Sequence, residues 1–198
     1  MQYLLRRAWH ILVLRVLPIS ANHRQNLLYL FRDPWALDNA KEHHRIRETS
    51  LIIRNRIGPC GELLEVGCAE GLQSATLRHN CEHLTGVDIS PRAVARAGLL
   101  VRDATFMAVD VFSAGPVPVP TADLVVACEM IYLLADVGAA ISRLESLGKA
   151  CLITFMDQAT AKVEPFLAER AILGRESISH GDLTWHVVWW NSPRFSVT

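Results

Sequence analysis

The residues most able to do chemistry are acidic side chains and glycines that follow short apolar segments. The clearest run comes directly after Leu63-Leu64 and reads Glu65-Val66-Gly67-Cys68-Ala69-Glu70-Gly71. Gly67 and Gly71 let the backbone turn sharply and let a ligand approach the main chain closely. Asp88 ends the next apolar segment about 20 residues after Gly67, where a carboxylate can accept hydrogen bonds from both hydroxyls of a ribose. The spacing therefore predicts a site for a ligand that contains a nucleoside.

Two classes of nucleoside ligand fit this layout, and the loop residues favour one of them. A dinucleotide-binding loop has the pattern G-x-G-x-x-G, but here the second and third glycine positions hold Ala69 and Leu72. Glu65 and Glu70 would repel a pyrophosphate, whereas S-adenosylmethionine (SAM) has no phosphate and carries a cationic amino group and sulfonium. We therefore expect SAM as the cofactor and methyl transfer as the reaction. The alternatives are an NAD-dependent oxidoreductase and a non-catalytic Rossmann-like interaction protein.

Two further carboxylates follow later apolar segments. Asp110 ends the third segment, where its carboxylate can accept from an adenine amino group and the Val111 N–H can donate to a ring nitrogen. Ile89 is also expected to line the cofactor site. Glu129 follows the apolar segment 123–128, at the position that faces the transferring methyl group in this kind of enzyme, and can orient or deprotonate an acceptor amine. The alternatives are that Asp110 only forms a turn and that Glu129 is simply exposed.

Alternating strands and helices must place these residues at one edge of a sheet. Apolar segments predict strands at 63–66, 84–89, 104–111, 123–128, 150–155 and 183–190, with helices at 71–79, from Pro91, at 136–147 and at 160–173. Ser90-Pro91 supplies an N-cap and a first-turn proline, and Gly148 is expected to end the helix before it. The pattern predicts an α/β fold with a Rossmann-like doubly wound sheet. We expect this sheet to be mostly parallel, with a terminal antiparallel hairpin and helices on both faces.

The segment ahead of the predicted sheet reads as helical. Residues 5–16 place apolar side chains at helical spacing with basic residues mostly opposite, and a second helix is expected at about 38–57. We expect residues 1–57 to form a cap or lid on a SAM-binding core of residues 58–198, within one structural domain. The alternative for the first helix is a membrane-surface contact through residues 1–17.

Charge and cysteine content narrow the class of partner. The 198-residue chain has 20 basic and 20 acidic residues, so nucleic acid is not expected as its main partner. We expect a small-molecule or glycan acceptor instead. The five cysteines include no C-x-x-C pair, which favours a cytoplasmic protein with no disulfide framework and no metal site. Basic residues interrupt the first apolar segment, which argues against a signal peptide or a membrane-spanning helix.

The motif series resembles that of class I SAM-dependent methyltransferases over roughly Glu62 to Phe155. Within that class, three segments are similar to the nodulation protein S group: Arg32–Asp38, His180-Gly181-Asp182 and Trp185–Trp190. The resemblance implies N-methylation of an amino sugar on a glycan or lipo-oligosaccharide. It also implies that Trp35 helps to close over the cofactor; the alternative is that this tryptophan only packs in the core.

Histidines and tryptophans supply candidates for the acceptor side. The candidate bases or acceptor contacts are His43, His44, His180 and His186. Each of them can also be an ordinary surface histidine. Sugar stacking is sought among Trp185, Trp189 and Trp190, of which the last two should lie on opposite faces of a strand. The cofactor-binding residues expected from the sequence are Glu65, Gly67, Cys68, Ala69, Gly71, Asp88, Ile89, Asp110, Val111 and Trp35, with Glu129 as the catalytic candidate.

Overall fold

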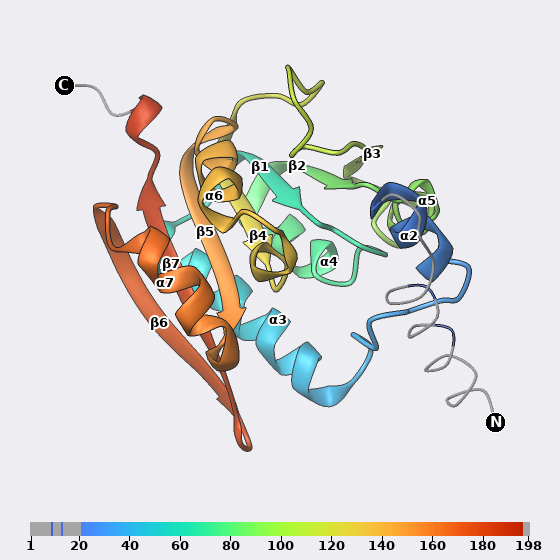
Figure 1. Cartoon of the computed structure of the whole chain (residues 1–198), viewed down its shortest axis with the longest axis horizontal. Helices are drawn as coiled ribbons and strands as arrows, with labels where there is room; N and C mark the ends of the chain where they lie inside the picture. The colour runs from blue at the N-terminus through green and yellow to red at the C-terminus, as the bar shows by residue number, and fades with distance from the viewer. Residues whose placement is uncertain (1–8, 10–12, 14–20, 196–198) are drawn as a thin grey trace.

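The structure is a computed structural model that describes Trp9, Val13 and residues 21–195. Within the described residues, seven strands form a sheet in the order β3-β2-β1-β4-β5-β7-β6 (Figure 1). The strands are β1 (Cys60–Val66), β2 (Cys81–Asp88), β3 (Thr105–Ala108), β4 (Ala122–Cys128), β5 (Gly148–Met156), β6 (Ile172–His180) and β7 (Leu183–Asn191). The first five strands are parallel, and β7 lies antiparallel between β5 and β6. The predicted fold class, including the terminal hairpin, is confirmed.

Helices cover both faces of the sheet. One face carries α6 (Val137–Glu145) and α7 (Thr160–Leu167), and the other carries α3 (Ala40–Ile52), α4 (Ser74–Leu77) and α5 (Pro91–Leu100). Alternate strand residues feed the two cores, so Leu64 packs on the side of α6 and α7 while Leu63 packs on the side of α3 and α4. No helix in the described part of the chain is long and apolar enough to cross a membrane.

The residues before the sheet form two described helices. The short α2 (Ala21–Leu28) packs against α5. After it, α3 starts at Asn39, whose side chain accepts hydrogen bonds from the Lys41 and Glu42 backbone N–H groups. A π-helical turn, Ile53–Ile57, extends α3 to Gly58, which has a φ of +91°. The helix expected at 38–57 is therefore confirmed, whereas the one expected at 5–16 lies outside the described residues except for Trp9 and Val13.

Of two helix-end signals expected from the sequence, the structure confirms the N-cap at Ser90 but not the helix end at Gly148. Ser90 caps α5 as expected, its hydroxyl accepting the Ala93 N–H at 3.4 Å. Gly148, in contrast, does not end a helix: α6 stops at Glu145, and Gly148 begins β5. A Cβ on Gly148 would lie 2.6 Å from Val125 Cγ2 and 2.7 Å from the Ala122 oxygen. The glycine is there because neighbouring strands approach too closely for a side chain.

The helix expected at 160–173 is too long. In the structure α7 ends at Leu167, and Ile172 already pairs with Trp190 as the first residue of β6. Most of β6 is polar and half-exposed because it is the edge strand, so its sequence lacks the apolar signal of a strand. The third strand is also shorter than expected and ends at Ala108, which leaves Asp110 in the loop that follows.

Candidate functional site

The loop after β1 is a tight turn whose backbone N–H groups are used within the protein. Gly67 and Gly71 have φ of +78° and +85°, and Ala69 also has a positive φ of +49°. The N–H groups of Gly67 and Cys68 both donate to the Val87 oxygen, at 2.8 and 3.0 Å, and the Gly71 N–H donates to the Cys68 oxygen at 2.9 Å. These bonds fasten the loop to the end of β2 and place its backbone beside Asp88.

Gly71 is required for a second reason, which is packing. A Cβ at this position would lie 2.9 Å from the Ala97 Cα, so α5 lies directly against the loop. At Gly67 a Cβ would meet the Met130 side chain at 3.2 Å. The glycines therefore allow close approach by the protein's own elements as well as by a ligand.

The Asp88 carboxylate is held by backbone donors at the end of β2. One oxygen accepts the Ala69 N–H at 3.1 Å, and the other accepts the Ser90 N–H at 2.9 Å. Burial raises the pKa of Asp88, and these backbone hydrogen bonds partly offset that rise. A carboxylate can accept about four hydrogen bonds, so beside the backbone donors of Ala69, Ser90 and Ile89 that of Asp88 can still accept from a ligand hydroxyl.

Glu65 lies beneath the loop. Its side chain is 3% exposed and accepts a hydrogen bond from the Ser74 hydroxyl at the start of α4. Burial raises the pKa of Glu65 to about 7, although the Ser74 hydrogen bond and the nearby Arg45 charge lower it. Glu65 therefore supports the loop and the helix behind it, and it is partly protonated at neutral pH.

Asp110 and Val111 lie in the loop after β3, next to Asp88. The Val109 N–H donates to the Asp88 oxygen at 2.9 Å, which fixes this loop to β2, and the Asp110 carboxylate accepts the Phe112 N–H at 3.1 Å. Arg143 of α6 donates to the Val111 oxygen at 2.6 Å and to the Gly115 oxygen at 2.6 Å. The loop is thus fixed at both ends.

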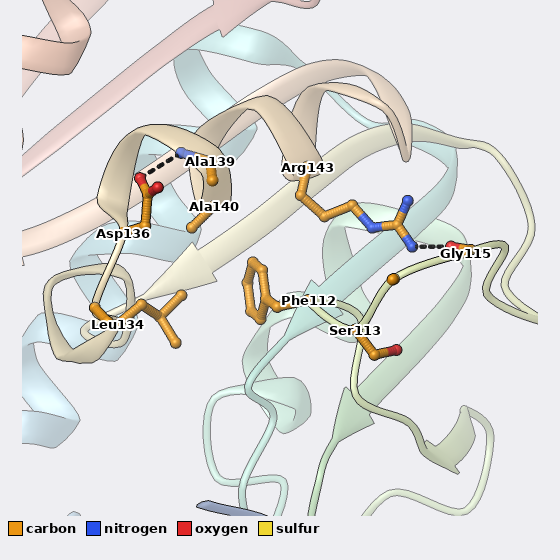
Figure 2. Close-up of a pocket in the computed structure, with 10 residues that line it drawn as sticks. Phe112, Ser113, Gly115, Leu134, Asp136, Ala139, Ala140 and Arg143 are labelled. Atoms are coloured by element: carbon orange, nitrogen blue, oxygen red, sulfur yellow. Dashed lines mark hydrogen bonds between the residues drawn. The ribbon is translucent and has the colours of Figure 1, made fainter.

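A cavity of about 420 Å³ lies behind this loop, between Phe112 and the first turns of α6 (Figure 2). Figure 2 shows Phe112 opposite Leu134 and Ala140, with the Arg143 side chain reaching across to Gly115. None of the cofactor-binding residues expected from the sequence lines it. The cavity is therefore a neighbour of the candidate site rather than the site itself.

Glu129 directly follows β4 with an unusual backbone conformation. It is not a glycine but has a φ of +54°, an uncommon conformation that is enriched at functional sites. Its carboxylate accepts the Thr154 hydroxyl at 2.9 Å and the Tyr132 hydroxyl at 3.0 Å. Burial raises the pKa of Glu129, while the charge of Arg45 and the two hydroxyl donors lower it. A carboxylate whose pKa is raised in this way is a better proton acceptor than an exposed glutamate.

Arg45 of α3 was not expected from the sequence. Among the described residues it is the one arginine or lysine that is almost completely buried, at 2% exposed. Its guanidinium donates to Glu42 at 2.8 Å and to the Gln73 side-chain oxygen at 2.9 Å, and Gln73 in turn donates to the Cys128 sulfur. Burial alone would lower the pKa of Arg45, but the charges of Cys128, Glu42 and Glu129 raise it. A permanent positive charge therefore lies between the loop after β1 and the end of β4.

Glu70 is paired with a cation rather than directed into the site. One carboxylate oxygen forms an ion pair with Arg96 of α5, and the other accepts the Asp33 N–H at 2.6 Å. The expectation that Glu70 makes the loop acidic toward a ligand is therefore not supported. Its partner Arg96 is distant in sequence and could not be identified from the motif.

Trp35 lies near the ribose side of the site. Its indole N–H donates to the hydroxyl of Tyr29, a side chain that is 2% exposed. Burial and the charge of Asp88 raise the pKa of Tyr29, which places this hydroxyl in the electrostatic range of the Asp88 carboxylate. Tyr29 was not expected from the sequence either.

The four candidate histidines make separate contacts. His186 contacts Asp157 at 2.9 Å and its ring lies 5.2 Å from that of Phe155. His44 and His180 come from α3 and the β6–β7 hairpin, and their ring centroids are 5.3 Å apart. His43 contacts Asp38 at 2.7 Å on the surface. The structure does not bring the four together.

The tryptophans of β7 belong mainly to the core. Trp185 and Trp190 are 2% and 0% exposed, and the Trp190 indole donates to Glu145 at 2.9 Å. Neither ring can present a face to a sugar, so the expected stacking role is wrong for these two. Trp189 and Trp190 do lie on opposite faces, as strand alternation predicted, and Trp189 covers Gly174.

Sheet order and the residues gathered at its carboxyl edge define the class I SAM-dependent methyltransferase fold. A solved structure with this fold is that of the N-methyltransferase NodS from Bradyrhizobium japonicum WM9 in complex with S-adenosyl-L-homocysteine. The two superpose with a TM-score of 0.70 at 23% sequence identity, over 88% of this chain and 100% of that chain. The (4+2)-cyclase SpnF shares the fold, with a TM-score of 0.63, 17% identity and coverage of 79% of this chain and 85% of that chain. The fold alone therefore does not determine the reaction.

The family is settled by sequence. The model of the nodulation protein S (NodS) family matches residues 22–154, so the chain belongs to the NodS family. Nodulation protein S from Sinorhizobium fredii (strain NBRC 101917 / NGR234) is 36% identical over 113 residues, which are 54% of this chain and 50% of that protein. The chain spans about half the length of the curated relatives that it matches.

Proposed function

We propose that this chain transfers a methyl group from SAM to an amine acceptor at the carboxyl edge of its sheet. The observation that carries the proposal is the Asp88 carboxylate, held at the end of β2 beside the Gly67–Gly71 turn and still able to accept a further hydrogen bond. A carboxylate at this position is the acceptor that ribose hydroxyls require. The chain's membership of the NodS family, and S-adenosyl-L-homocysteine in the solved NodS structure, support it.

We assign the cofactor site to residues at the ends of three neighbouring strands. Asp88 accepts the ribose hydroxyls, and Asp110 with the Val111 N–H receives the adenine. Trp35 is assigned to the ribose side because of its position beside Tyr29. The rest of the proposed site is formed by Glu65, Gly67, Cys68, Ala69, Gly71 and Ile89, in which Glu65 supports the loop from below.

Arg45 is proposed as the partner of the SAM carboxylate. The methionine part of SAM carries a carboxylate, and the surrounding carboxyl groups of Glu65, Asp88 and Glu129 cannot stabilise it. Arg45 is buried within electrostatic range of Glu65 and Glu129 and is permanently charged. A charge-assisted hydrogen bond from this guanidinium would anchor the methionine end, and the same acidic groups suit its ammonium.

Glu129 is proposed to receive the acceptor's proton. When bound, SAM supplies a methyl group on an already activated sulfonium. The acceptor nitrogen must present a free lone pair in line with the carbon–sulfur bond, so a protonated amine must first lose a proton. The Glu129 carboxylate, fixed by Thr154 and Tyr132 and with a raised pKa, can take that proton.

The acceptor is proposed to be an amino sugar on a glycan or lipo-oligosaccharide, on the strength of family membership. The chain's division into a lid of residues 1–57 and a core of residues 58–198 is part of the same proposal. We also propose a cytoplasmic location, since the five cysteines are free thiols. An NAD-dependent oxidoreductase and a non-catalytic interaction protein remain the competing functions.

Calorimetric titration with S-adenosyl-L-homocysteine and with NAD separates the proposed methyltransferase from the two competing functions. Binding of S-adenosyl-L-homocysteine but not NAD is expected. Transfer of labelled methyl from SAM should then be measured onto a glucosamine oligomer with one free amine and onto the fully N-acetylated oligomer. Label on the free amine alone supports N-methylation, and label on neither rejects the proposed acceptor.

A further inference from the structure

The carboxyl end of α2 is capped by side chains from other elements. Helices leave their last carbonyl groups without partners inside the helix. Here Arg92 of α5 donates to the Asn26 oxygen at 3.2 Å, and Arg96 donates to the Tyr29 oxygen at 2.9 Å and the Phe31 oxygen at 3.0 Å. The Trp9 indole donates to the Leu27 oxygen at 3.1 Å. The end of α2 is therefore fixed to α5 mainly through two arginines one turn apart.

Arg96 also joins this helix end to the loop after β1. Its guanidinium pairs with Glu70, and the second oxygen of Glu70 accepts the Asp33 N–H. One guanidinium thus contacts both the segment after α2 and the loop that carries Gly67–Gly71. The two side chains are 25% and 20% exposed, so solvent only partly screens their charges.

The segment Tyr29–Asp38, here called the strap, carries Tyr29 and Trp35 to the edge where Asp88 lies. Its shape is defined by its own bonds. The Asp33 carboxylate accepts the Leu37 N–H at 2.6 Å, and Asp33 and Ala36 have φ of +48° and +54°. The strap is therefore folded in itself, and Glu70 and Arg96 join it to the loop after β1 and to α5.

We propose that Glu70 and Arg96 form a latch that holds the strap over the cofactor site, and that both are positioning residues for cofactor retention. The inference rests on the proposed function. Neither side chain touches the cofactor; they act through Tyr29 and Trp35. The latch gives Glu70 a role in the loop after β1 other than attracting a cationic ligand, since Arg96 already neutralises its charge.

The latch is tested with the variants Arg96→Met and Glu70→Gln, their double variant, and Arg92→Met as the matched control. Arg92 lies on the same helix face and caps the same helix end, but it donates to Asn26 and is not bonded to Glu70. Affinity for S-adenosyl-L-homocysteine is measured by calorimetry, and its release rate by stopped-flow tryptophan fluorescence. Each latch variant should weaken affinity about tenfold, mostly through faster release, and the double variant should be no weaker than Arg96→Met alone.

Several outcomes overturn the latch. They are additive effects of the two substitutions, unchanged affinity, or an equal effect of Arg92→Met, which would indicate general helix capping. Arg96→Lys keeps the charge without the planar fork, so it covers the case in which Arg96→Met does not fold, and it should lose at least threefold in affinity. If the unmodified protein does not bind S-adenosyl-L-homocysteine, the proposed function fails; if it binds and the variants match it, only the latch fails.

Discussion

Replacing Glu65 by glutamine should change how the stability of the protein depends on pH. The side chain is 3% exposed, and burial raises its pKa from the ordinary 4.5 to about 7. Between these two values the folded protein holds a proton on Glu65 that the unfolded chain has released. The free energy of unfolding therefore falls as the pH rises through this window and levels off above about pH 7.

The magnitude follows from the difference between the two pKa values. Each tenfold change in proton affinity corresponds to about 1.4 kcal/mol, so Glu65 alone lowers the free energy of unfolding by about 3 kcal/mol between acid and alkaline pH. A glutamine does not titrate, and its side-chain oxygen can still accept the Ser74 hydroxyl. Glu65→Gln should therefore be more stable than the unmodified protein at pH 8, by up to about 3 kcal/mol, and similar to it near pH 4.5.

Urea unfolding of both proteins from pH 4.5 to 8.5 measures this difference directly. Carboxyl groups that do not interact with Glu65 contribute equally to both curves and cancel when one is subtracted from the other. Ser74→Ala removes the hydrogen bond that lowers the pKa of Glu65, so the free energy of unfolding of this variant should go on falling to a higher pH than that of the unmodified protein. Parallel curves for Glu65→Gln and the unmodified protein would show that folding does not raise the pKa of Glu65, and the reasoning would be wrong.

Three other substitutions test the site itself. Asp88→Asn should weaken S-adenosyl-L-homocysteine binding by about 1.5–3 kcal/mol, because the ribose hydroxyls lose a charged acceptor. Calorimetry measures the affinity, and an unchanged circular dichroism spectrum shows that the variant is folded. Unchanged affinity in a folded variant would mean that Asp88 does not bind the ribose. Gly71→Ala should lower the free energy of unfolding by more than Gly115→Ala, since both glycines have positive φ but only at Gly71 would a Cβ meet a neighbour, 2.9 Å away at the Ala97 Cα. Equal losses in thermal melts would show that strain, not packing, matters there. Glu129→Gln should reduce turnover about 10²–10⁴-fold with cofactor affinity nearly unchanged; a loss of affinity instead of turnover would make Glu129 a cofactor ligand.

The residues at the carboxyl edge could be predicted because their positions follow from chain order. Asp88 and Glu129 each come directly after an apolar segment, and parallel strands bring their carboxyl ends to one edge of a sheet. The start of α5 was also readable, since Ser90-Pro91 is a local signal that acts on its own helix turn. Local patterns and strand order together were enough for the fold and the acidic residues.

Arg45 could not be predicted because burial within a polar helix is decided by packing. The helix contains Arg45 and Arg47 two residues apart, and in the structure their side chains are 3% and 64% exposed. Each arginine has an acidic neighbour in the helix, Glu42 for Arg45 and Glu48 for Arg47, so the local sequence does not distinguish them. The contact that does, from Arg45 to Gln73, lies 28 residues further along the chain. The same holds for Glu70 and Arg96, whose pairing depends on how α5 packs against the loop.

The loop after β1 favours SAM over a dinucleotide because of its engaged backbone donors rather than because of the acidity expected from its sequence. Glu65 is partly protonated near neutral pH and Glu70 is paired with Arg96, so neither supplies the full negative charge expected from the sequence. A phosphate-binding loop, however, needs backbone N–H groups that point at the ligand. In this loop the N–H groups of Gly67 and Cys68 are bonded to β2, and those of Ala69 and Gly71 to Asp88 and Cys68. A pyrophosphate would find these donors already engaged, whereas the hydroxyls of a ribose need an acceptor, which the Asp88 carboxylate provides.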